Sequence, residues 1–203
     1  LNLNKSSDIE YLNIIDEKIS EEGLKIYNFR REYICKINNY INDIYKNYDK
    51  KGKICLQYIS DFKDENKDKI LESIKKNRAK EIKIGIALFG IHRDDIIFLY
   101  DNYDAREYCS QGIQKLIVLA MKLSEICIFI NDYDIKPILL LDDLFSELDE
   151  KNRNNIFKSL SNDIQIFITT TDLKNINKNI LNKAKIYNLD EIGRWLKWMM
   201  IME

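Results

Sequence analysis

Two adjacent carboxylates, Asp142 and Asp143, end a continuous apolar run that opens at Pro137. Such a run is typical of a strand buried on both faces, usually in a parallel sheet. The strand delivers its last side chains to the sheet edge where ligands bind in open α/β folds. There, one carboxylate can hold Mg²⁺ while its neighbour orients or deprotonates a water that attacks a phosphate. An aspartate that only caps the next helix would look the same, so the pair alone leaves both interpretations open.

Two further polar segments could contact a phosphate. Ser110-Gln111-Gly112 opens a patterned helix, where a hydroxyl and free backbone N–H groups lie at the positive end of the helix dipole. Most sequences of this kind are ordinary N-caps. Thr169-Thr170-Thr171 follows the apolar run 164–168, and its hydroxyls could cap a helix or contact a phosphate.

The elements that must position these residues follow from apolar periodicity. From about Asp8 to Asp49 the spacing predicts one long helix, or a pair broken at Gly23. A strand at 54–59 and a charged helix from Asp64 to Glu81 come next, and two short β-prone runs then flank Gly90 to Asp95. The remaining predicted elements are a helix that starts near Ser110 and extends to about Ile130, strands at 138–141, 164–168 and 185–189, and helices at 150–160 and 173–181.

Strands that alternate with helices predict an α/β fold. We expect a helical subdomain with a short strand over residues 1–82, and an α/β lobe over residues 83–190. Residues 191–203 form a tail for which the sequence predicts no element.

Composition narrows the class of protein. The 203 residues carry 32 Lys and Arg against 33 Asp and Glu, for a formal charge of -1. This balance, with 45% hydrophobic residues, argues against a disordered charged tail and against a nucleic-acid binder that is basic over its whole surface. No apolar run is long enough to cross a bilayer, and the four cysteines form no C-x-x-C pair, which argues against zinc and a disulfide framework. We expect a cytoplasmic protein that does not contact membranes.

In this order and spacing, the segments GIHRDD, CSQGIQK, PILLLDDLFSELDE and IQIFITTTD resemble the C-terminal half of an ABC-type ATPase head. More closely, they resemble the RecF family of recombination mediators, within the SMC-like branch of these ATPases. The resemblance extends from Leu12 to about Leu189. It implies a mostly parallel sheet flanked by helices, with an α-helical subdomain on its N-terminal side.

The resemblance also implies a role for each matching position. Asp142 would be the magnesium-side Walker B residue and Asp143 the catalytic carboxylate. The D-loop at the dimer seam would run from Ser146 to Asp149, and Thr170 would stand where many relatives have a switch histidine. The signature motif, which meets ATP held by the other subunit, would comprise Ser110, Gln111, Gly112 and Gln114.

Three features depart from the family pattern. Ile113 occupies a usually polar signature position, and Ile91 replaces a proline. No G-x-x-x-x-G-K-[ST] phosphate loop occurs in the sequence. Because the sequence also starts at Leu1 without a methionine, we expect a C-terminal fragment of a slow ATPase that is inactive alone.

By resemblance, the intact protein would be a DNA replication and repair ATPase that uses ATP and Mg²⁺. It would dimerise with ATP on gapped DNA or at a junction of single- and double-stranded DNA. Together with other recombination mediator proteins, it would assist recombinase loading in recombinational repair and the SOS response. The alternatives are another SMC- or ABC-type ATPase head and a truncated, non-catalytic module that binds DNA or a partner. Lysines in Lys50–Lys53, Lys75-Lys76 and Arg78–Lys80 would be a solvated face or phosphate contacts.

The polar segment around the sole histidine has a structural interpretation as well. His92 lies between two short β-prone runs, with no nucleophile identified beside it. We expect a structural role for it, and Arg93 and Asp94 could pair with each other or shape the nucleotide site.

Overall fold

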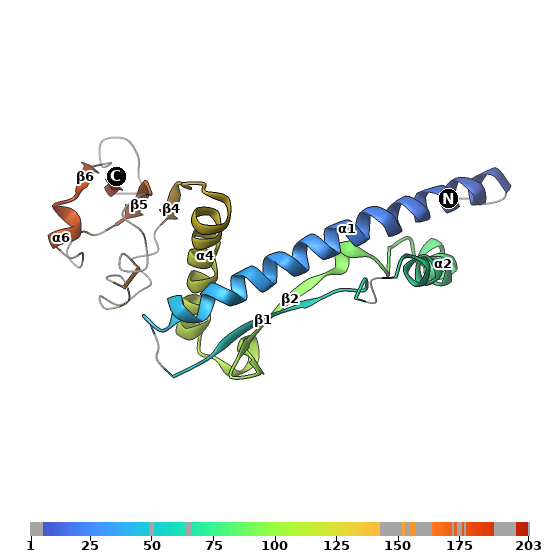
Figure 1. The fold of residues 1–203 in the computed structure, drawn as a ribbon, viewed down its shortest axis with the longest axis horizontal. Helices are drawn as coiled ribbons and strands as arrows, with labels where there is room; N and C mark the ends of the chain where they lie inside the picture. Colours follow the sequence, from blue (N-terminus) through green and yellow to red (C-terminus); the bar gives the residue numbers. More distant parts are fainter. Residues whose placement is uncertain are drawn as a thin grey trace. The chain divides into compact units, whose positions relative to one another are not determined.

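The computed structural model describes residues 6–48, 51–63, 66–142, 152, 155, 156, 164–171, 173, 176, 178–188 and 198–202. It confirms the α/β class, with helices and two separate sheets (Figure 1). The chain forms two compact units, one from residues 1–39 with 53–109 and the other from residues 40–52 with 110–203. The segment 83–109 therefore lies in the same unit as the predicted helical subdomain.

The first element is a single continuous helix, α1 (Ser6–Tyr45), without a break at Gly23. A Cβ atom at position 23 would lie 2.4 Å from the Phe62 ring, so the missing side chain lets Phe62 pack directly on the helix. Phe62 is fully buried and forms a small core with Tyr27, Ile70 and Ile74. Packing against this core outweighs the cost of about 1 kcal/mol for a glycine in a helix.

An antiparallel sheet forms the second part of this unit. Strand β1 (Ile54–Ile59) pairs along its whole length with β2 (Asp95–Tyr100), which turns back into the short β3 (Tyr103–Asp104). Asp101 and Asn102 form the turn with positive φ angles, as a tight hairpin requires. Asn38 of α1 bonds the backbone N–H and carbonyl of Leu56, which fixes the hairpin against the helix (Figure 1).

Helix α2 (Lys67–Ile84) completes the first unit. The side chain of its N-cap, Asn66, accepts hydrogen bonds from the N–H groups of Asp68 and Lys69. The helix ends at Gly85, which has the left-handed conformation. The prediction of a β-prone run at 82–89 is wrong, because α2 continues to Ile84 and no strand forms there. Glu81 then accepts from the N–H groups of Leu88 and Phe89, which shapes the loop into the turn η1 (Ile91–Arg93).

The second unit is built on α4 (Gln111–Tyr133), which follows the one-turn helix α3 (Ala105–Tyr108) of the first unit. One face of α4 is buried, including Ile117, Ala120, Leu123 and Ile128. The Tyr40 hydroxyl, in the end of α1 that belongs to this unit, donates a hydrogen bond to Asp132 over 3.0 Å. This bond and the buried face hold α4 in place.

The second sheet has the strand order β4-β5-β7-β6. Strands β4 (Leu139–Asp142) and β5 (Ile166–Thr170) are parallel, whereas β7 (Trp198–Met202) is antiparallel to both β5 and β6 (Ala184–Asn188). The described sheet is therefore mixed, not mostly parallel. The reason is that part of the predicted tail forms β7 and inserts between β5 and β6.

Three smaller observations complete the fold. Of the predicted helix 173–181, the structure describes the single turn α6 (Lys178–Leu181). All four cysteines are free thiols. No described helix is both long enough and apolar enough to cross a membrane.

Candidate functional site

The N-terminus of α4 is an exposed, capped helix start. Ser110 has extended backbone angles, and its hydroxyl accepts a hydrogen bond from the Ile113 N–H over 3.4 Å. Its carbonyl accepts the first helical bond, from the Gln114 N–H. Gln111 and Gly112 are exposed in the first turn, where backbone N–H groups and the helix dipole favour an anion.

Among the described residues, nothing around Gly112 requires a glycine. There, a Cβ atom would meet only the Ser110 hydroxyl oxygen, at 4.0 Å, which is ordinary contact distance. Glycine is unfavourable in helices relative to alanine. A glycine at this open position therefore leaves space for a group from outside the described chain to approach the backbone.

Asp142 ends β4 with an exposed side chain. In the parallel register Asp142 lies beside Thr169 of β5, whose hydroxyl donates a hydrogen bond to the Asp142 carboxylate. This bond holds the carboxylate at the carboxyl end of the strand. It links two of the predicted polar segments, and the contact is made by Thr169.

The predicted switch residue, Thr170, points to the opposite side of β5. Ile166, Ile168 and Thr170 alternate on the buried face of the strand, and Thr170 is only 2% exposed. The sequence singled out three consecutive threonines but not the one that reaches Asp142. Which threonine lies beside Asp142 is determined by the strand register, because neighbouring residues in a strand face opposite sides.

A groove with a volume of about 730 Å³ connects the two segments. On the α4 side it is lined by Gln111, Gln114 and Lys115, and on the β4 side by Leu139 to Asp142. Two predicted signature residues and the predicted magnesium-side carboxylate therefore lie along one groove.

The groove also corrects a prediction about β4. The apolar run predicted a strand buried on both faces, yet Leu140 is 70% exposed while Leu141 is buried. The cause is that β4 is the edge of the sheet in the described part of the chain and has the open groove beside it. Three other predicted site residues, Asp143, Ser146 and Asp149, lie outside the described residues.

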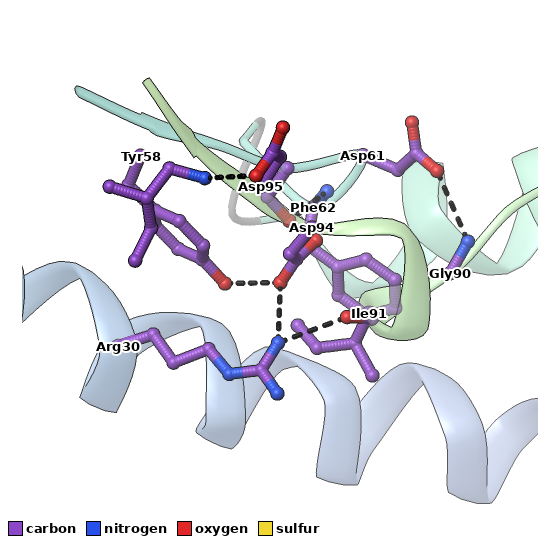
Figure 2. Close-up of polar contacts among 10 residues, drawn as sticks. Arg30, Tyr58, Asp61, Phe62, Gly90, Ile91, Asp94 and Asp95 are labelled. Atoms are coloured by element: carbon purple, nitrogen blue, oxygen red, sulfur yellow. Dashed lines mark hydrogen bonds and ion pairs between the residues drawn. The ribbon is translucent and has the colours of Figure 1, made fainter. Parts of the chain in front are cut away.

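The polar segment around His92 forms a second, separate cluster, within the first unit (Figure 2). Arg30 of α1 donates to the Asp94 carboxylate and to the Ile91 carbonyl, each over 3.0 Å, and the Tyr58 hydroxyl of β1 also contacts Asp94. The Asp94 side chain is only 3% exposed. Asp94 therefore pairs with Arg30 rather than with the adjacent Arg93, and η1 forms although Ile91 stands in place of a proline.

The electrostatics of this cluster are those of a structural site. Burial, and then the contact with Asp94, raise the pKa of Tyr58 to about 12, so this hydroxyl stays protonated at neutral pH. His92 is exposed, and its ring is 3.5 Å from the Ala87 carbonyl. Gly90 has a φ of 141°, and a Cβ atom there would lie 3.0 Å from that ring, which explains the glycine.

Comparison with known proteins places these features in context. No family model matches the chain. The chain is 33% identical over 198 residues to the DNA replication and repair protein RecF of Lactobacillus johnsonii and 34% identical to that of Ligilactobacillus salivarius. These matches cover 93% and 94% of this chain but only 53% and 52% of the relatives, so the chain spans about half the length of the curated relatives it matches.

Solved structures give the same result. The recombination mediator protein RecF of the RecFOR pathway, in its RecF-ATPrS form, matches with a TM-score of 0.72 and 31% identity over 86% of this chain and 48% of that one. The RecF-ATP form matches with the same TM-score and 29% identity. The resemblance to part of RecF and the predicted fold class are therefore confirmed.

Proposed function

We propose that this chain is the signature-bearing C-terminal part of a RecF-like DNA-repair ATPase. The observation that carries the proposal is the exposed start of α4, where Ser110, Gln111 and Gly112 present a capped, sterically open anion site. Similarity to RecF-ATP structures supports ATP as the ligand. A cytoplasmic location and a role in recombinational repair and the SOS response fit the same proposal.

The proposed mechanism is a switch. ATP held by the phosphate loop of one subunit meets the α4 N-terminus of the other, so ATP closes a homodimer around gapped DNA or a single-/double-strand junction. The Ser110 hydroxyl and the first-turn N–H groups then face the terminal phosphate. Asp143 activates the attacking water, and hydrolysis reopens the dimer so that recombinase loading with other mediator proteins can proceed. Ser146 and Asp149 transmit the nucleotide state across the seam.

The described residues fit a magnesium ion at the end of β4. Mg²⁺ is commonly held by one or two carboxylates together with waters and substrate phosphates. Asp142 is exposed, and the bond from Thr169 orients it, so Asp142 would hold the ion, which would neutralise phosphate charge. The described residues contain no cluster of three or more acidic, histidine or cysteine ligands, which agrees with an ion shared with the nucleotide.

A second candidate is a non-catalytic module that binds DNA or a partner. Two observations favour it: the sequence has no phosphate loop, and Ile113 provides no polar side chain at the signature. Unlike the first candidate, such a module does not respond to ATP. This difference can be measured.

Subunit mixing tests whether the signature acts in trans. In the native gene product that carries this sequence, Ser110→Arg and Asp143→Asn should each abolish ATP hydrolysis. In a mixed dimer, one composite site combines the intact Asp143 of one subunit with the intact Ser110 of the other. An equal mixture should therefore recover ATP hydrolysis, up to about a quarter of the wild-type rate when the subunits pair at random, since each mixed dimer has one intact site. A mixture as inactive as its components would show that the signature does not act across the dimer.

A further inference from the structure

Helix α2 carries a row of four lysines along one line. Lys69, Lys76, Lys80 and Lys83 are separated by seven, four and three residues. At about 100° per residue they fall within an arc of about 60° on the helix. With a rise of about 1.5 Å per residue, the row is about 21 Å long. We call these four residues the α2 lysine row.

The lysine row faces away from the packed side of the helix. Ile70 and Ile74, which lie about 110° and about 150° around the helix from the centre of the row, are buried in the core of the first unit. All four lysines of the row are exposed. The row is therefore a surface feature that this unit does not cover.

Other cations of α2 are already used within the unit. Arg78 pairs with the buried Asp16 of α1 and also donates to Asn13 over 3.0 Å. Lys67 lies 3.7 Å from Glu21 of α1. These cations hold α2 against α1. Arg78 is not part of an exposed basic face, because its side chain is only 20% exposed and is engaged by Asp16.

The lysines of the row, in contrast, have no ion-pair partner among the residues that the structure describes. Glu72 is the acidic side chain closest to the row around the helix, and the other two acids of α2 lie elsewhere, Asp68 in the first turn and Glu81 bonded to the following loop. The whole chain has a formal charge of -1, so this local positive charge does not come from a basic composition.

From this arrangement we propose that the α2 lysine row binds the phosphate backbone of duplex DNA. This inference rests on the proposed role in DNA repair and names the surface that would carry DNA. A DNA strand presents one phosphate per about 3.4 Å of axis, so a row about 21 Å long spans about six phosphates. Lysines act as flexible point charges without base contacts. Binding through the row is therefore independent of sequence and sensitive to salt.

The test uses the native gene product and a duplex DNA labelled for fluorescence anisotropy. In one variant all four lysines of the row are replaced by glutamine, which removes the charge and keeps helix propensity. The matched control replaces four exposed lysines off the row, namely Lys18, Lys46, Lys75 and Lys183. Both variants change the net charge equally, and Lys75 lies on α2 itself.

The row variant should bind duplex DNA about ten- to a hundredfold more weakly at low salt, with a log–log salt slope shallower by about 2 to 4. The affinity of the control variant for duplex DNA should stay within about threefold of the wild-type affinity. A loss of this size is the general effect of its lower net charge. Glu72→Gln should strengthen binding about two- to fivefold, because it removes the acid beside the row. ATP hydrolysis without DNA should be unchanged in all three.

Equal DNA binding by the wild type, the row variant and the Glu72→Gln variant would overturn the inference while leaving DNA binding in place. A wild-type protein that does not bind DNA at all would overturn the proposed function as well. A row variant that loses affinity no more than the control would show a general charge effect and would also reject the row as the binding surface.

Discussion

Asp94 connects three elements through one buried carboxylate, since it contacts Arg30 of α1 and Tyr58 of β1 from the end of η1. Asp94→Asn should lower the free energy of unfolding by about 2 kcal/mol, because Arg30 loses its charged partner at a buried site. Urea denaturation measures this change. Asp95→Asn is the control, since its side chain is 60% exposed, and it should change stability by at most about 0.5 kcal/mol. Equal effects of the two variants would contradict the described contacts.

Tyr58 gives this cluster a pH dependence with a definite sign. Its pKa is raised from 10.0 to about 12 by burial and by Asp94, so the folded state holds the phenol proton more tightly than the unfolded state does. The resulting stabilisation is complete below about pH 10 and is lost as the pH rises towards about 12. The free energy of unfolding of Tyr58→Phe should consequently decline less over this interval than that of the wild type. Parallel declines would contradict the assignment.

At the scale of an element, two substitutions at the start of α4 should have opposite effects on stability and the same effect on the response to ATP. Ser110→Ala removes the N-cap bond and should cost about 1 kcal/mol, whereas Gly112→Ala should stabilise the unit by up to about 1 kcal/mol. Both variants should nevertheless lose the response to ATP, since one removes the proposed phosphate ligand and the other fills the open approach. Thermal unfolding without nucleotide, combined with ATP-dependent light scattering, measures both effects. A Gly112→Ala protein that responds normally to ATP would show that nothing approaches this backbone.

In strand β4, alanine substitutions of the two neighbouring leucines should differ strongly in their effect on stability. Leu141→Ala should destabilise the chain by about 2 to 3 kcal/mol, because this side chain is only 7% exposed. Leu140→Ala should change stability by no more than about 0.5 kcal/mol, as Leu140 is 70% exposed. Chemical denaturation of the two variants distinguishes an open strand face from a strand buried on both sides.

Elements with strong local patterns were predictable from sequence. The helical periodicity of α4 and the alternation of β1 depend on side chains close together in the chain. Strand β7 was missed because its pairing with β5 and β6 comes from the fold. The same holds for the contacts of Asp142 with Thr169 and of Arg30 with Asp94, which join residues 27 and 64 positions apart. The candidate site was therefore predictable as a set of segments, but the pairing of individual side chains was not.

At the scale of the whole molecule, the proposed function requires two copies of the protein to close on ATP. The matched RecF relatives are about twice as long as this chain, and the groove beside β4, with the α4 start at one side, is open in the described residues. A sandwiched nucleotide would bring the α4 start of one subunit against the phosphates bound by the other. Asp143→Asn should block hydrolysis without blocking this closure, so it isolates the closed state.

The most direct test is the mass of the Asp143→Asn native gene product, measured by light scattering with and without ATP and Mg²⁺. This variant should be a monomer without nucleotide and a long-lived dimer with ATP, and the dimer should be absent from the double variant that also carries Ser110→Arg. An Asp143→Asn protein that remains monomeric with ATP would contradict the ATP-sandwiched dimer.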